Sequence, residues 1–177
     1  ISSLPALAIA DIVREFDYTK PSIVGDLLTP LQLRKVVQRL PHVGGNVEET
    51  LCAVILQREE KYRGAFFREL GKSELTLMAL AVAFDFEVLL RFAYTNMFGE
   101  FDEEEVTENE VKKGEWEELL FSLKSCSPRT FRRVVSMVEQ AKDAVPRRNL
   151  ALELERECRK VFGKMPSASD DPYASFL

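Results

Sequence analysis

The stretch TPLQLRKVVQRL at residues 29–40 carries the helix signal that recurs along this chain. Thr29 is a natural N-cap, and Pro30 suits the first helical position because it has no backbone N–H to leave unpaired. Gln32 completes a capping box. Apolar residues then return at helical spacing, namely Leu33, Val36, Val37 and Leu40. The pattern predicts an amphipathic helix that ends at Pro41.

The same signals divide the rest of the chain into helices. Asn46, Ser73 and Ser127 are further N-caps, and glycines or prolines end most of the segments. We expect about seven helices, over 4–17, 29–40, 46–62, 74–98, 110 or 115 to 125, 128–145 and 147–162. No stretch alternates with period two for long enough to predict a strand. The predicted class is all-α, with antiparallel hairpins stacked as a HEAT-like α-solenoid or a helical bundle.

Size and composition fit one globular domain. The chain has 177 residues, of which 46% are apolar and 30% are charged, and this composition excludes wholesale disorder. We assign 1–163 to a single helical domain and 164–177 to a mobile tail. The segment 74–98 is apolar on nearly all sides, so we expect it at the centre. Because the chain opens on Ile1, we also expect it to be a piece of a longer protein.

Two stretches of the chain are nearly the same. Residues 127–138 read SPRTFRRVVSMV, and laying 29–61 on 127–159 without gaps gives nine identities, including both Val-Val pairs. Repetition of one helical hairpin would explain this similarity. Convergence would explain it equally, because Ser/Thr-Pro followed by an amphipathic pattern suits any helix start.

The stretch DLLTPLQLRKVVQRL at 26–40 also resembles the first helix of MIF4G-type HEAT domains. The resemblance covers about 35 residues. It implies a scaffold whose helical face binds other proteins and sometimes RNA.

Cysteine content and hydropathy indicate a reducing compartment. Cys52, Cys126 and Cys158 are dispersed, which is typical of packed thiols in the cytoplasm or nucleus. The apolar run 75–84 is too short to cross a bilayer, so we expect no membrane contact.

We find no motif that carries catalysis or binds a cofactor or metal. His42 is the only histidine, and no nucleophile elbow accompanies it. The acidic stretch 99–111 fails as an EF-hand loop, because Val106, Thr107 and Lys113 occupy positions that calcium binding reserves for other residues. We therefore expect no enzyme, no cofactor and no metal site.

Charge is distributed unevenly and supplies the candidate binding residues. Residues 1–123 carry a net charge of −9, whereas 124–164 carry +6. The candidates are Arg129, Arg132, Arg133, Arg147 and Arg148, together with the acidic Glu103, Glu104 and Glu105. The basic patch could bind an acidic partner, pair with the chain's own acids, or be solvated. The acidic residues could form a solvated loop or a docking site for a basic partner.

These observations favour a non-enzymatic scaffold or adaptor module. We expect it to bind another protein, with an acidic or amphipathic helical segment, through a helical groove or its charged face. The alternative is RNA bound by the arginine patch of the last two helices. Against RNA, no aromatic residue is interleaved with the arginines, and the sequence pI is about 5.1.

Overall fold

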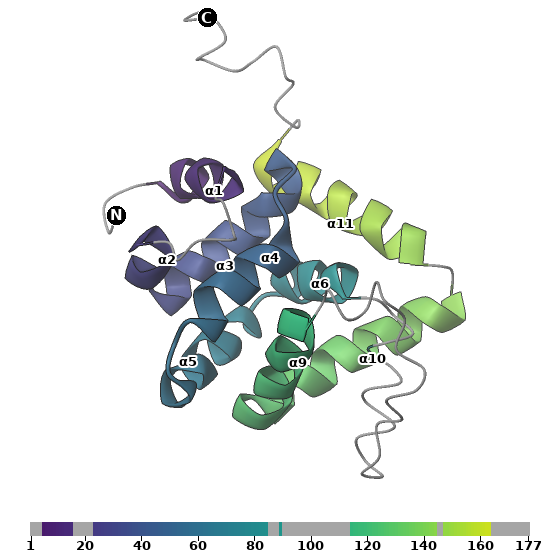
Figure 1. Cartoon of the computed structure of the whole chain (residues 1–177). Helices are drawn as coiled ribbons and strands as arrows, with labels where there is room; N and C mark the ends of the chain where they lie inside the picture. Colours follow the sequence, from purple (N-terminus) through teal and green to yellow (C-terminus); the bar gives the residue numbers. More distant parts are fainter. Residues whose placement is uncertain (1–4, 16–22, 85–88, 90–113, 145–146, 164–177) are drawn as a thin grey trace, which may run out of the picture.

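A computed structural model describes residues 5–15, 23–84, 89, 114–144 and 147–163. Over these residues the chain contains helices and no strand, which confirms the all-α class. The helices pack against one another (Figure 1). They are α1 (Ala6–Arg14), α2 (Ile23–Leu27), α3 (Pro30–Arg39), α4 (Val47–Leu51), α5 (Glu60–Leu70), α6 (Glu74–Ala83), α9 (Gly114–Cys126), α10 (Pro128–Ala144) and α11 (Arg147–Phe162). A 3-10 helix, η1 (Leu40–Val43), follows α3, and a π-helix, η2 (Cys52–Leu56), follows α4.

The N-caps predicted at Thr29, Asn46 and Ser73 form as expected. The Thr29 hydroxyl accepts from the Gln32 amide at 3.3 Å, and the Gln32 side chain accepts from the Thr29 amide at 3.0 Å. The Asn46 side chain caps α4 by accepting from the Glu49 amide at 3.1 Å, and Ser73 caps α6. These local bonds explain why the starts of α3, α4 and α6 lie where the sequence predicts them.

The prediction of a single helix over 46–62 is wrong. The chain instead forms α4 and η2, turns at 57–59, and begins α5 at Glu60. The Arg63 guanidinium explains the break, because it donates to the carbonyls of Leu56 at 2.8 Å and Arg58 at 2.9 Å. It thereby satisfies acceptors that a continuous helix would pair with amides. Gly64 lies inside α5.

The helix predicted over 74–98 also ends early. Helix α6 stops at Ala83, and Phe84 follows with an extended backbone (φ −89°, ψ 146°). The sequence has no glycine or proline there, but Phe84 is only 2% exposed, so tertiary packing rather than a helix breaker accompanies this end. Residues 85–88 and 90–113 lie outside the described part of the chain.

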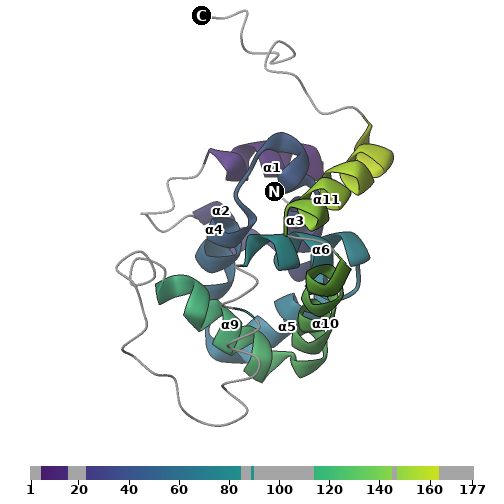
Figure 2. The ribbon, with the colours of Figure 1, turned by 90° about the vertical axis from the view of Figure 1, so that its right-hand side faces the viewer.

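Helix α6 is central, as its apolar sequence predicts. It packs against α3, α10 and α11, which lie around it (Figures 1 and 2). Helix α3 also contacts α1 and α5, while α9 packs against α5, η2 and α10. One hydrophobic cluster joins residues from α1 to α11, and its largest fully buried side chains include Phe67, Phe84, Leu33, Leu77 and Leu80.

The two similar stretches do not fold alike. Seven residues, 40–46, separate α3 from α4, whereas 145–146 alone separate α10 from α11. Arg58 is half-buried and donates to the Gly25 carbonyl at 2.6 Å, while its counterpart Arg156 is exposed. The ungapped repeat required equal turns and equivalent surroundings. The shared residues are therefore ordinary helix-start and core chemistry, and the helices form a bundle rather than copies of one hairpin.

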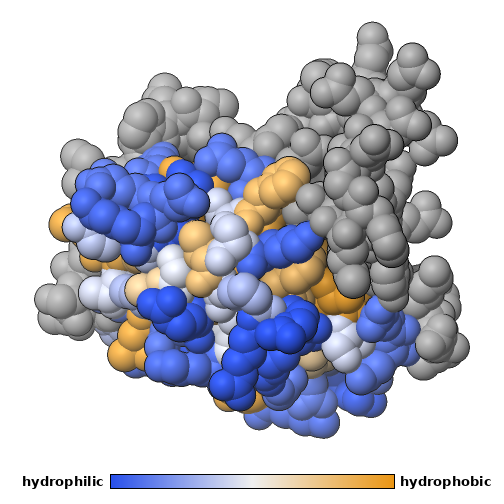
Figure 3. All heavy atoms as spheres, turned by 90° about the horizontal axis from the view of Figure 1, so that it is seen from below, coloured by the Kyte–Doolittle hydropathy of each residue, from blue (hydrophilic) through white to orange (hydrophobic). Residues whose placement is uncertain are grey.

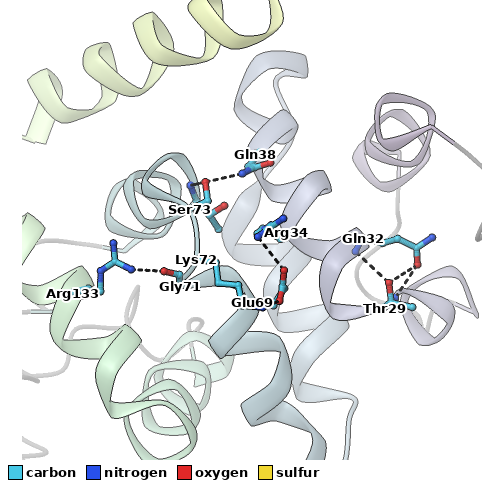
Figure 4. A network of polar contacts seen from close by, with 10 residues as sticks. Thr29, Gln32, Arg34, Gln38, Glu69, Gly71, Lys72, Ser73 and Arg133 are labelled. Carbon is cyan, nitrogen blue, oxygen red and sulfur yellow. Dashed lines mark hydrogen bonds and ion pairs between the residues drawn. The ribbon is translucent and has the colours of Figure 1, made fainter.

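The turn between α5 and α6, residues 71–73, and the end of α5 just before it are held from two sides. From α3, Gln38 donates to the Ser73 hydroxyl at 2.7 Å, and Arg34 pairs with Glu69 at 3.0 Å (Figure 4). From α10, Arg133 donates to the carbonyl of Gly71.

Gly71 in this turn also packs closely against Thr130 of α10. The Thr130 hydroxyl donates to the Phe67 carbonyl at 3.1 Å, and a Cβ on Gly71 would lie 2.5 Å from the same hydroxyl oxygen. Gly71 has an ordinary helical φ of −68°, so space rather than backbone freedom requires glycine there.

Replacing Gly71 with Ala should therefore cost about 1 to 3 kcal/mol of unfolding free energy through overpacking. Thr130→Ala alone should cost about 1 to 2 kcal/mol, because it removes a buried hydrogen bond. The double variant should cost less than the sum, since the shortened side chain makes room for the new methyl group. Urea denaturation of all four proteins checks this. Strictly additive costs would show that the two residues do not compete for space.

Replacing Phe84 with Ala should cost about 3 to 5 kcal/mol, as truncation of a buried aromatic does. The matched control is Tyr62→Ala on α5, where the side chain is 54% exposed and the cost should stay below about 1 kcal/mol. Urea denaturation measures both. Equal costs for the two variants would contradict a core position for Phe84.

Candidate functional site on helix α10

Helix α10 presents one face to the core and one to solvent. Its buried stripe contains Phe131, Val134 and Val138. Ser127 lies just before the helix, and its hydroxyl is hydrogen-bonded to the Thr130 hydroxyl at 2.9 Å. Both side chains are buried. The register fixed by these residues decides which arginines face outward.

Arg133 does not belong to the free surface. Its guanidinium donates to the Gly71 carbonyl and pairs with Glu74, so it joins α10 to the start of α6. The sequence left open whether the arginines pair with acidic residues of the same chain. Arg133 does so, but its partner Glu74 lies outside the acidic stretch 99–111. Arg133 therefore has a structural role that its spacing beside Arg129 and Arg132 does not reveal.

Arg129 and Arg132 face solvent. Both are exposed, and no carboxylate among the described residues pairs with either one. Arg132 donates to the Pro128 carbonyl of its own helix at 3.3 Å. Ser136 and Gln140 are also exposed and continue from Arg132 at four-residue spacing. We call Arg129, Arg132, Ser136 and Gln140 the outer face of α10.

Sequence reasoning missed Ser136 and Gln140. They lie on the same face as Arg132 because residues four apart are neighbours on a helix surface. The Gln140 amide is 3.5 Å from the Ser136 hydroxyl. Their four-residue spacing is visible in the sequence, but neither residue is charged, so the distribution of charge does not point to them.

The remaining candidates are not brought to this face by described contacts. Arg147 and Arg148 begin α11, and their side chains lie outside the described part of the structure, as do Glu103, Glu104 and Glu105. Farther along α11, the cations pair with glutamates of the same helix: Arg156 with Glu153, Arg159 with Glu155, and Lys160 with Glu157. Part of the +6 charge of 124–164 is therefore neutralised within α11.

The single histidine is an interior residue. His42 in η1 is 4% exposed, and its pKa is lowered by burial and, to a lesser extent, by the nearby Arg39. Burial also raises the pKa of Cys158, and Glu155 and Glu157 act in the same direction. Among the described residues, no group of three His, Cys, Asp or Glu side chains could hold a metal ion.

The surface is mixed rather than broadly apolar where it can be seen from below (Figure 3). Hydrophilic residues dominate this view, and apolar residues appear in small groups between them. None of the helices in the described ranges is long and apolar enough to cross a membrane.

Comparison with known proteins identifies no relative. No family model matches the chain, and no curated protein or solved structure matches it either. The resemblance of 26–40 to MIF4G-type HEAT domains therefore stays a prediction.

Charge reversal should separate the structural arginine from the exposed ones. Arg133→Glu should lower the unfolding free energy by about 1 to 3 kcal/mol, because it removes charged hydrogen bonds and places a second carboxylate beside Glu74. Arg129→Glu and Arg132→Glu should each change it by less than about 0.5 kcal/mol, as exposed substitutions do. Urea denaturation compares the three, and an unaffected Arg133→Glu variant would mean that its contacts do not contribute to stability.

Proposed function

We propose that this protein is a non-enzymatic interaction module that binds an acidic segment of another protein on the outer face of α10. The observation that carries the proposal is the pair of exposed guanidinium groups of Arg129 and Arg132. They sit on a helix whose position is fixed by Thr130 and Arg133. A fixed helix presents its side chains at little entropic cost, which favours binding.

The chemistry of the face indicates the kind of partner. Two guanidinium groups bind carboxylates in paired hydrogen bonds, and the hydroxyl of Ser136 and the amide of Gln140 extend the polar row. An acidic or amphipathic helix laid along α10 would meet these groups in order. The partner is thus a protein segment with acidic residues at helical spacing.

RNA bound through the same arginines is the alternative function. The net charge of −5 disfavours it, because nucleic-acid binding depends on an excess of positive charge. The pairing of Arg156, Arg159 and Lys160 within α11 further reduces the charge available to phosphates.

We also propose that the protein works in the cytoplasm or nucleus. Support comes from Cys52, Cys126 and Cys158, none of which forms a disulfide bond. A reducing compartment preserves such thiols, two of which are buried in the core.

The test is capture of partners from cell lysate by the purified chain, with and without nuclease. The double variant Arg129→Glu/Arg132→Glu should lose the partner by more than tenfold, because the partner's acids would then face like charge. The control is Arg156→Glu/Arg159→Glu, which changes the net charge equally but on α11, and should bind as the wild type does.

Three outcomes decide between the functions. Loss only in the α10 variant, with capture resistant to nuclease, supports the protein partner. RNA is supported if nuclease abolishes capture and salt weakens it. The plot of log binding constant against log salt concentration should then fall with a slope of about 0.7 per phosphate contact. Full capture by the α10 variant excludes this face.

A further inference from the structure

Helix α11 is joined to the rest of the molecule mainly by apolar contacts. Its buried side chains are Leu150, Leu154 and Cys158, and the helix packs against α6, η1, α3 and α10. The ion pairs of its described side chains all lie within the helix itself. Among the described side chains of α11, the only hydrogen bond to another described element is a long one, from the Cys158 thiol to the Gln38 carbonyl at 3.8 Å.

The C-terminal end of α11 packs on a histidine. The Phe162 ring centroid is 5.8 Å from that of His42, and the Arg39 guanidinium lies 4.2 Å from the Phe162 centroid. His42 Nδ1 is fully buried and has no hydrogen-bond partner in the described part of the chain. The contact therefore suits a neutral imidazole, since a charged one would have a buried N–H without an acceptor beside a second cation.

We propose that α11 is a pH-sensitive latch, which detaches from η1 and α6 when His42 takes up a proton. Detachment would expose the apolar stripe of α11 and the surface of α6 beneath it. Helix α11 carries the Phe162 ring that packs on His42, and no ion pair joins its described side chains to another described helix, whereas Thr130 and Arg133 tie α10 to the α5–α6 turn.

The charged groups around His42 do not offset the positive charge of a protonated imidazole. From α3 comes Arg39, which lowers the pKa of His42. From α1 comes Arg14, which is 3.4 Å from the Val43 carbonyl and already pairs with Glu15 at 2.9 Å.

The groups on α11 offer no compensation either. Cys158 is a thiol whose pKa is raised, so it stays neutral at acidic pH. The carboxylates of Glu155 and Glu157 pair with Arg159 and Lys160 on the outer side of the same helix. No carboxylate is among the groups that shift the pKa of His42.

The direction of the pH effect follows from linkage. Burial and, to a lesser extent, Arg39 lower the pKa of His42 while α11 is docked, and release of α11 removes part of that burial and raises the pKa toward its ordinary range. The released form therefore binds the proton more tightly. The equilibrium constant for release should be constant above about pH 6.5 and rise by up to tenfold per pH unit below it, until the docked form also titrates.

Hydrogen–deuterium exchange of the full chain tests the latch between pH 7.5 and 5.5, after correction for the intrinsic pH dependence of exchange. We expect amides of α11 to lose up to about tenfold in protection, while those of α10 and α3 keep theirs. Unchanged protection in α11, or equal loss in all three helices, would overturn the proposal. This measurement needs no variant.

The matched variants are His42→Asn, which cannot take up the proton, and Arg39→Gln, which removes the neighbouring cation. His42→Asn should abolish the extra exchange of α11 below pH 6.5. Arg39→Gln should make the extra exchange of α11 below pH 6.5 smaller, because the docked imidazole then protonates with less penalty. An acid response of α11 that survives in His42→Asn would show that another group controls it.

Discussion

The position of the candidate surface depends on how closely α10 approaches the turn between α5 and α6. Gly71 leaves no room for a side chain there, and the Thr130 hydroxyl binds the Phe67 carbonyl in the space that remains. The same turn is held from the opposite side by Gln38 and Arg34 of α3. Two helices distant in sequence are thus registered against one short segment, and α10 can present its arginines at a fixed angle to the bundle.

Arginine has two different uses in this molecule. Arg58, Arg63 and Arg133 direct their guanidinium groups to backbone carbonyls near helix ends, where acceptors would otherwise lack partners. Arg129 and Arg132 face solvent and are available to other molecules. A sum of charges along the sequence counts both kinds equally, and it therefore overstates the positive surface near the C-terminus.

The sequence predicts helix starts better than helix ends in this chain. Thr29, Asn46 and Ser73 act within three residues of themselves, so local chemistry suffices to place them. The end of α6 at Phe84 and the break before α5 involve packing and a guanidinium from the next helix, which no local pattern contains. The short α2 gave no clear periodic signal over its five residues.

The candidate site was predictable to the same extent. Charge and helical spacing correctly selected Arg129 and Arg132 as exposed residues, because their direction follows from the buried stripe of Phe131 and Val134. They could not separate Arg133, whose partners Gly71 and Glu74 lie about sixty residues away and are set by the tertiary fold. The acidic residues 103–105 lie outside the described structure, so their assignment stays a prediction.

The π-helix η2 marks a place where homologous chains could differ in length by one residue. Because its hydrogen bonds span five residues instead of four, residues 52–56 contain one residue more than an α-helical turn of the same rise. Losing one residue here would convert the segment to regular α-helix while Leu51 and the chain before it kept their place. An alignment of homologous chains should accordingly accept a single-residue gap within 52–56, inside the helical segment that α4 and η2 form, where gaps are otherwise rare.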